Sequence, residues 1–127
     1  MKRIFLLVAL LVSAHSSWAL TLSEAAENLL YFEYAKQSSV HCERRGTPSH
    51  QTLAAWEKKN HGLYRRSIET IRSEAKRRGA SPAEQDMIVS ESINIQQTHA
   101  QENIAKKGVP CAKFEAWLDG FSTLLKL

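Results

Sequence analysis

The apolar positions of the chain fall into a short N-terminal block and four longer segments with helical spacing. In segment 110–126, seven apolar residues share one arc when successive residues are placed about 100° apart, and the charged residues lie outside it. The arc consists of Cys111, Phe114, Trp117, Leu118, Phe121, Leu124 and Leu125. The segment is therefore predicted to be an amphipathic helix, with Trp117 and Phe121 as the anchors of its core face.

Three further segments are predicted to be helical from weaker patterns. Segment 48–78 keeps one apolar arc through Gly62, which favours a single long helix and leaves a kink at that glycine open. Segment 22–44 is apolar almost all round in its middle, as expected of a helix with neighbours on more than one side. Segment 82–107 has a thinner stripe, formed mainly by Val89, Ile93, Ala100 and Ile104.

Glycine and proline mark the boundaries between these segments. Gly46, Gly79 and Gly108 are each followed within three residues by a proline, a pattern typical of one helix ending before another begins. Capping boxes at 21–24 and 81–84 support two of the helix starts. Because short connections make consecutive helices antiparallel neighbours, the chain after the N-terminal block is predicted to form one all-α domain, an up-down-up-down four-helix bundle.

The N-terminal block, MKRIFLLVALLVSAHSSWA, has the features of a secretory signal peptide. Two cations precede the apolar run 4–12, and the small residues Ser17 and Ala19 fit a cleavage site after Ala19. The run is too short to cross a hydrocarbon core of ~30 Å. We therefore expect residues 1–19 to be removed, residues 20–127 to be exported to the periplasm or secreted, and no integral membrane segment to remain after cleavage.

Removal of the leader makes the two cysteines informative. The mature chain keeps 108 of the 127 residues and a net charge of +2, from 15 basic and 13 acidic residues. Cys42 and Cys111 would lie at one end of the bundle, where the first helix ends and the fourth begins, and export favours a disulfide between them. Because Cys42 lies nearly opposite Val40 on an ideal helix, we expect the first helix either to loosen after Val40 or to pack differently.

The histidines give little sign of a metal or haem site. The mature chain has His41, His50, His61 and His99, and no two of them share an i, i+4 spacing. The sequence also has no Cys-x-x-Cys-His pattern for covalent haem attachment. No metal and no cofactor is therefore expected. Because bundle cores can hold small molecules, a small-ligand, metal or haem carrier is the alternative function.

Signs of catalysis are also weak. Glu33 falls inside an apolar arc, where burial could raise its pKa for general acid or base chemistry. More often such a residue pairs with a neighbouring helix, and no partner acid, Gly-rich phosphate loop or nucleophile motif accompanies it. The chain is therefore not expected to be an enzyme, and no catalytic residue is predicted.

Segment 48–78 carries a row of cations, which we call the basic row. Its members, Lys58, Arg65, Arg72 and Lys76, lie within about 40° of one another around the helix axis and form a candidate site for an anionic partner. The alternative is a solvated face in which Glu69 bridges Arg65 and Arg72. Since the protein is expected to be exported, the predicted partner is an envelope protein or an anionic envelope component, and not nucleic acid.

Segment 82–107 carries uncharged polar residues along one side: Ser90, Asn94, Gln97, Thr98 and Gln101. We take Asn94, Gln97 and Gln101, the amide row, as candidate partner-binding residues, because amides donate and accept hydrogen bonds without the desolvation cost of a full charge. A solvated face is the equal alternative. Together the two rows lead us to expect an exported helical protein that binds a protein partner in the cell envelope, as an inhibitor, immunity protein, chaperone or assembly factor does.

Overall fold

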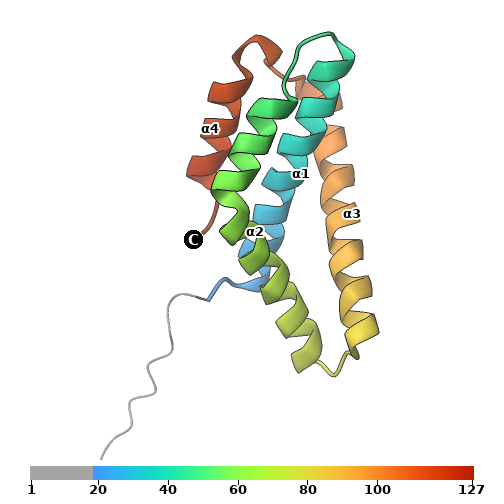
Figure 1. The fold of residues 1–127 in the computed structure, drawn as a ribbon. Helices are drawn as coiled ribbons and strands as arrows, with labels where there is room; N and C mark the ends of the chain where they lie inside the picture. Colours follow the sequence, from blue (N-terminus) through green and yellow to red (C-terminus); the bar gives the residue numbers. More distant parts are fainter. Residues whose placement is uncertain (1–18) are drawn as a thin grey trace, which may run out of the picture.

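A computed structural model of the protein describes residues 19–127, which form four α-helices and a short 3-10 turn (Figure 1). The elements are α1 (Leu22–Arg44), α2 (His50–Arg77), α3 (Pro82–Lys107), the 3-10 turn η1 (Cys111–Lys113) and α4 (Phe114–Leu124). Residues 19–127 contain no strand, so the predicted all-α class is confirmed for this part of the chain. The predicted signal peptide lies outside the described residues except for Ala19, and its cleavage stays a prediction.

The sequence signals for helix ends act as predicted at most boundaries. Thr21 caps α1 and Ser81 caps α3 in reciprocal capping boxes, each with the glutamate three residues later. Gly46, Gly79 and Gly108 have φ angles of 82°, 92° and 67°. These left-handed glycines end α1, α2 and α3 and let the chain turn toward the next helix.

Two helices differ from their predicted bounds. α2 begins at His50 rather than at position 48, because Ser49 is the N-cap residue, and it then continues through Gly62 as one helix. α4 occupies only part of the predicted segment 110–126. Pro110 has a non-helical ψ of 73°, and the chain becomes extended at Leu125, where ψ is 136°.

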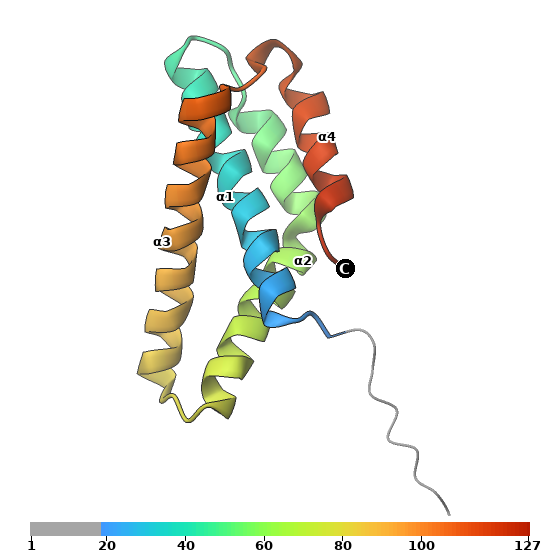
Figure 2. The ribbon, with the colours of Figure 1, turned by 180° about the vertical axis from the view of Figure 1, so that it is seen from behind.

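Helix α1 occupies the centre of the molecule. Consecutive helices alternate in direction; α1 packs along both α2 and α3, and the shorter α4 packs on α2 and α1 near the C-terminal end of α1 (Figure 1 and Figure 2). Phe32 of α1 packs on Trp56 of α2, with ring centroids 5.2 Å apart. Tyr34 of α1 packs on Phe121 of α4, at 5.1 Å. These neighbours explain why α1 is apolar almost all round its middle.

The core has two parts along α1. The smaller lies near the α1 N-terminus and contains Ala25, Leu29, Ile71 and Val89. The larger contains Phe32, Tyr34, Ala35, Cys42, Trp56, Ala100, Ile104, Phe114, Leu118, Phe121 and Leu125. Of the two predicted anchors on α4, Phe121 is buried and Trp117 is partly buried against this larger cluster.

An asparagine in α1 holds the C-terminal tail. Asn28 is fully buried, and its Nδ2 donates hydrogen bonds to the backbone oxygen of Lys126, at 2.9 Å, and to Ser67 Oγ, at 3.1 Å. The backbone nitrogen of Lys126 donates to Asn28 Oδ1 at 2.7 Å. The side-chain amide therefore pairs with the tail as a second peptide group would, which explains why the chain leaves α4 in an extended conformation.

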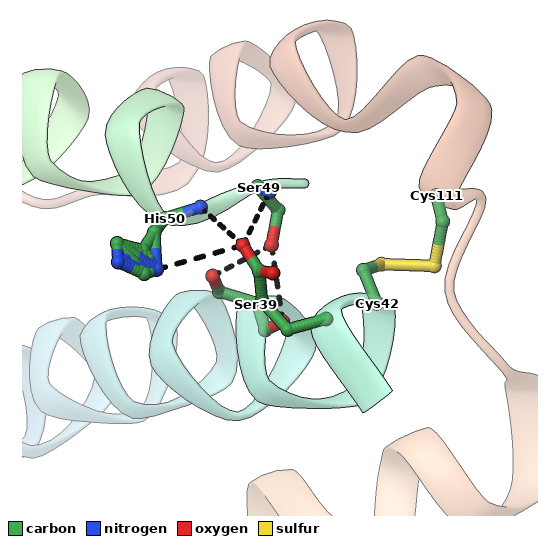
Figure 3. Close-up of a disulfide and its surroundings, with 6 residues drawn as sticks. Ser39, Cys42, Ser49, His50 and Cys111 are labelled. Atoms are coloured by element: carbon green, nitrogen blue, oxygen red, sulfur yellow. Dashed lines mark hydrogen bonds and ion pairs between the residues drawn. A yellow bond between two sulfur atoms is a disulfide. The ribbon is translucent and has the colours of Figure 1, made fainter. Parts of the chain in front are cut away.

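The predicted disulfide between Cys42 and Cys111 is present (Figure 3). Its Cα atoms lie 5.5 Å apart, and the bridge joins residues separated by 69 positions. The expected loosening of α1 after Val40 is wrong, because α1 continues to Arg44. α1 packs differently instead: neighbours on several sides allow Cys42 to be buried while Val40, on the opposite side, is 41% exposed.

Candidate partner-binding surface

The basic row lies mostly on the surface of α2. Lys58, Arg65 and Lys76 are exposed, and no carboxylate of the described residues forms an ion pair with them. The side chain of Arg72 is 39% exposed and forms a short ion pair with Asp86 of α3. The bridge by Glu69 between Arg65 and Arg72, which belonged to the alternative of a solvated face, is not formed among residues 19–127: Arg72 pairs with the neighbouring helix instead.

The amide row lies along one flank of α3. Asn94 and Gln101 are exposed, and Gln97 is half-buried. Gln101 Nε2 donates a hydrogen bond of 3.3 Å to Gln37 Oε1 of α1. This bond shows that the flank of α3 carrying the amide row borders α1.

The two rows lie on the same side of the molecule. Asp86, which Arg72 contacts, and the amide row occupy neighbouring positions around α3 at helical spacing. The Arg72–Asp86 pair therefore marks where the basic row meets this flank of α3, and the Gln37–Gln101 bond marks where the flank meets α1.

A groove runs over α1 between α2 and α3, and we call it the α1 groove. It consists of two open cavities that share Gln37, Val40 and Arg44 as their floor. The α3-side cavity has a volume of about 700 Å³ and reaches Gln101, Ile104 and Val109. The α2-side cavity has a volume of about 660 Å³ and reaches His50, Leu53 and Glu57. The groove thus combines an exposed apolar floor at Val40 with polar and charged walls.

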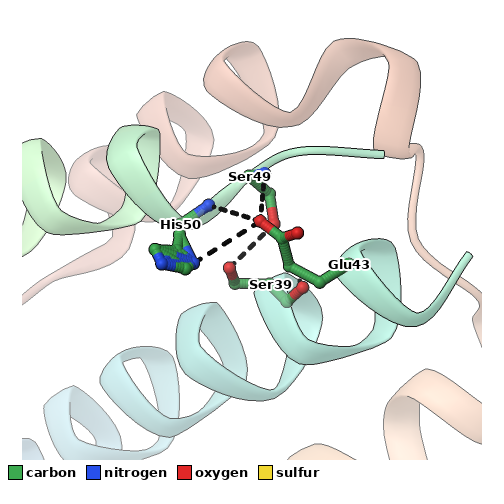
Figure 4. A network of polar contacts seen from close by, with 4 residues as sticks. All are labelled: Ser39, Glu43, Ser49 and His50. Carbon is green, nitrogen blue, oxygen red and sulfur yellow. Dashed lines mark hydrogen bonds and ion pairs between the residues drawn. The ribbon is translucent and has the colours of Figure 1, made fainter. Parts of the chain in front are cut away.

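Glu43 connects the end of α1 to the start of α2 (Figure 4). Its Oε1 accepts hydrogen bonds from the backbone nitrogens of Ser49, at 2.7 Å, and His50, at 2.9 Å. Ser49 cannot cap its own helix, because its hydroxyl is hydrogen-bonded to the hydroxyl and backbone oxygen of Ser39. Glu43 therefore caps α2 from another helix, and these bonds hold the pKa of its carboxyl below 4.5.

The cluster around Glu43 contains serine, histidine and a carboxylate but is not arranged as a nucleophilic triad. His50 Nδ1 lies 3.5 Å from Glu43 Oε1. The hydroxyls of Ser39 and Ser49 bond to each other, at 2.8 Å, and not to the imidazole (Figure 3 and Figure 4). A nucleophile–base pair needs a hydrogen bond between hydroxyl and imidazole, so this arrangement is a structural link between α1 and α2.

Glu33 is the buried carboxylate expected from the sequence. It is 5% exposed, and burial raises its pKa above 4.5. The ammonium of Lys36, 3.8 Å away, opposes this shift, whereas the negative charge of Glu57 on α2 reinforces it. The two charges that act on this buried carboxyl, Lys36 and Glu57, therefore oppose each other.

The histidines do not gather at one point. His41 lies along the α3-side cavity, His50 contacts Glu43, and His61 and His99 are exposed on α2 and α3. In residues 19–127, no group of three or more His, Cys, Asp and Glu side chains is placed to hold a metal ion.

The comparisons with protein-family models, with characterised proteins and with solved structures find no match to this chain. No described helix is both long enough and apolar enough to cross a bilayer.

Proposed function

We propose that the chain is an exported, non-enzymatic helical protein that binds a protein partner in the cell envelope through the side carrying the basic row and the amide row. The observation that supports this proposal most directly is the location of the two rows on one side of the molecule. The Arg72–Asp86 pair and the Gln37–Gln101 bond border that side. The predicted leader and the disulfide both favour an oxidising compartment such as the periplasm.

The chemistry of the two rows is complementary. Lys58, Arg65 and Lys76 have no carboxylate partner among the described residues, so their charges are free to attract an acidic surface over a distance of about one Debye length. The exposed amides of Asn94 and Gln101 can donate to and accept from polar groups of either kind. Cations would steer the partner, and amides would fix its orientation.

Affinity capture from an envelope extract of cells that produce the protein tests this proposal. The variant Lys58→Glu/Arg65→Glu/Arg72→Glu should fail to capture the partner. Capture by the wild type should weaken steeply as the salt concentration rises. The matched control is Lys59→Glu/Arg66→Glu/Arg77→Glu, which makes the same charge change on the same helix about 100° away around its axis. This control should keep the partner.

The amide row is tested separately with Asn94→Ala/Gln97→Ala/Gln101→Ala. Substitutions at such surface positions usually change stability by less than about 0.5 kcal/mol each, so the variant should fold normally and still bind the partner less tightly. Circular dichroism and thermal unfolding establish that each variant is folded. Equal capture by the wild type and by both row variants would refute the proposed surface.

A further inference from the structure

The α3-side cavity carries positive charge that the protein itself does not neutralise. Arg44 and Arg45 line this cavity, both are exposed, and no carboxylate of the described residues lies within ion-pair distance of either guanidinium. The acid nearest to them in sequence, Glu43, is directed away and bonds the backbone of Ser49 and His50.

The helix dipoles reduce this charge without cancelling it. α1 and α3 run in the same direction (Figure 2). Arg44, the last residue of α1, and Gly108, which follows α3, both line the cavity, so the C-terminal ends of the two helices border it. Each helix end carries about half a negative charge. Two guanidinium groups carry about two positive charges, and Lys106 and Lys107 end α3 at the same pole. The cavity therefore keeps a net positive charge of about one or more.

The same cavity also presents apolar surface. Val40 is 41% exposed on its floor, and Ile104 and Val109 form part of its wall. The volume of this open cavity, about 700 Å³, lies in the usual range of ligand-binding clefts. An anionic polymer or a bare anion would need the guanidinium groups and would gain nothing from Val40. A segment with both acidic and apolar side chains would use both features.

We infer that the α3-side cavity is the docking site for an acidic, amphipathic segment of a protein partner, an inference that rests on the proposed function. Apolar side chains of the segment cover Val40, and its carboxylates pair with Arg44 and Arg45. The site lies beside the amide row, since Gln101 lines the cavity and bonds Gln37 on its floor. It adds to the proposed surface a specific chemical class of ligand.

Fluorescence anisotropy with a labelled synthetic peptide tests the inference. The probe is an amphipathic helical peptide with leucine on one face and glutamate on the other. Arg44→Gln/Arg45→Gln should weaken its binding about tenfold, because two exposed ion pairs with the probe are lost. Val40→Gln should weaken it about fivefold by removing apolar contact area.

The end of α2 supplies the matched control. Arg77→Gln/Arg78→Gln removes two adjacent arginines that also precede a glycine, but these arginines are bonded to Glu74. This variant should change the affinity for the probe by less than about twofold. All four substituted arginines and Val40 are exposed, so circular dichroism should show unchanged folding.

Three outcomes would overturn the inference: no binding of the probe to wild type, equal losses in the two arginine variants, or equally tight binding of a polyglutamate peptide without leucine. Capture of the natural partner distinguishes a failure of this docking site from a failure of the proposed function. If the basic-row variant loses the partner while Arg44→Gln/Arg45→Gln keeps it, the docking site is wrong and the proposed function stands. If wild type and both row variants capture the partner equally, the proposed surface fails whatever the probe does.

Discussion

The sequence Arg-Arg-Gly begins at the last residue of both α1 and α2, but the arginines at the two ends have different partners. At the end of α2, Glu74 bonds Arg77 and Arg78, each at 3.0 Å, and the pKa of Glu74 is lowered to about 2. At the end of α1, Arg44 and Arg45 have no carboxylate partner among residues 19–127. The same three residues therefore give arginines that share a carboxylate partner in one place and arginines without a carboxylate partner beside a cavity in the other.

The difference follows from where the nearby acid stands. Glu74 precedes the two arginines by three and four positions, which places all three side chains on one helix face. Glu43 precedes Arg44 by one position and cannot face it. Its carboxylate instead reaches forward to the start of α2.

The two helix ends also differ in whether the following helix has an N-cap side chain of its own. α3 is capped by its own Ser81 in a capping box. α2 has no such cap, because the hydroxyl of Ser49 bonds Ser39. Glu43 therefore accepts hydrogen bonds from the uncapped backbone nitrogens of α2, and the arginines at the end of α1 remain available to a ligand.

The largest expected effect concerns the disulfide, which ties down the end of α1 and has no counterpart at the end of α2. Cys42→Ser/Cys111→Ser opens a loop of 69 positions and should lower the free energy of unfolding by as much as about 4 kcal/mol. Denaturant unfolding measures the loss. Hydrogen exchange should show faster opening of the last turn of α1 and little change in the local opening of the last turn of α2. A uniform increase at both ends would contradict this distinction.

A smaller effect is expected from the two acids themselves. Glu43→Ala should lower the melting temperature at pH 7 more than Glu74→Ala, because Glu43 satisfies two backbone nitrogens at a helix start and Glu74 forms exposed ion pairs. Both pKa values are lowered by folding, so both contributions are present above pH 4.5 and are lost as the pH falls through the lowered values.

Thermal unfolding of both variants and the wild type between pH 7 and pH 2 checks this prediction. The difference between wild type and Glu43→Ala should shrink as the pH falls below 4.5. The smaller difference for Glu74→Ala should persist nearly to pH 2, where its carboxyl titrates. Equal losses at pH 7 would show that the contact of Glu43 with α2 is no more than another surface interaction.

Much of the fold could be predicted because the signals are local. The glycines after α1, α2 and α3, the capping boxes and the apolar arc of α4 each depend on residues within a few positions of one another. The disulfide could be predicted from topology together with the predicted export and the count of two mature cysteines, since alternating helices bring the end of the first to the start of the fourth. The misplaced boundaries lie where a distant contact overrides the local signal, as at Leu125, which is followed by the Asn28–Lys126 bonds.

The candidate surface could be predicted only in part from the sequence. Helical spacing placed the basic row and the amide row on their helices, but it could not show that Arg72 contacts Asp86 rather than Glu69, because Asp86 lies on another helix. The α1 groove was missed altogether. It depends on how α2 and α3 stand apart around Val40, and on the direction that Glu43 takes. Spacing along one helix carries no information about either.

The smallest expected effect concerns Glu33, a third acid in the same comparison. Glu43 is satisfied by backbone nitrogens and Glu74 by guanidinium groups, whereas the described partner of Glu33 is the ammonium of Lys36 at 3.8 Å. Burial raises the pKa of Glu33 above 4.5, so its ionised form is less favourable in the folded protein than in the unfolded chain. Glu33→Gln should therefore raise the melting temperature slightly at pH 7.

The sign of this effect with pH is opposite to that for Glu43. A carboxyl with a raised pKa contributes stability that is present below its unfolded value and is lost as the pH rises through the folded value. The advantage of Glu33→Gln over wild type should thus be greatest near neutral pH and vanish below about pH 4, where both side chains are uncharged. Thermal unfolding from pH 7 to pH 3.5 measures this, with Glu57→Gln as a companion that should reduce the advantage by removing a repelling charge. A lower melting temperature for Glu33→Gln at pH 7 would mean that the attraction to Lys36 outweighs the cost of burial. Ionised Glu33 would then stabilise the fold, as Glu43 and Glu74 do.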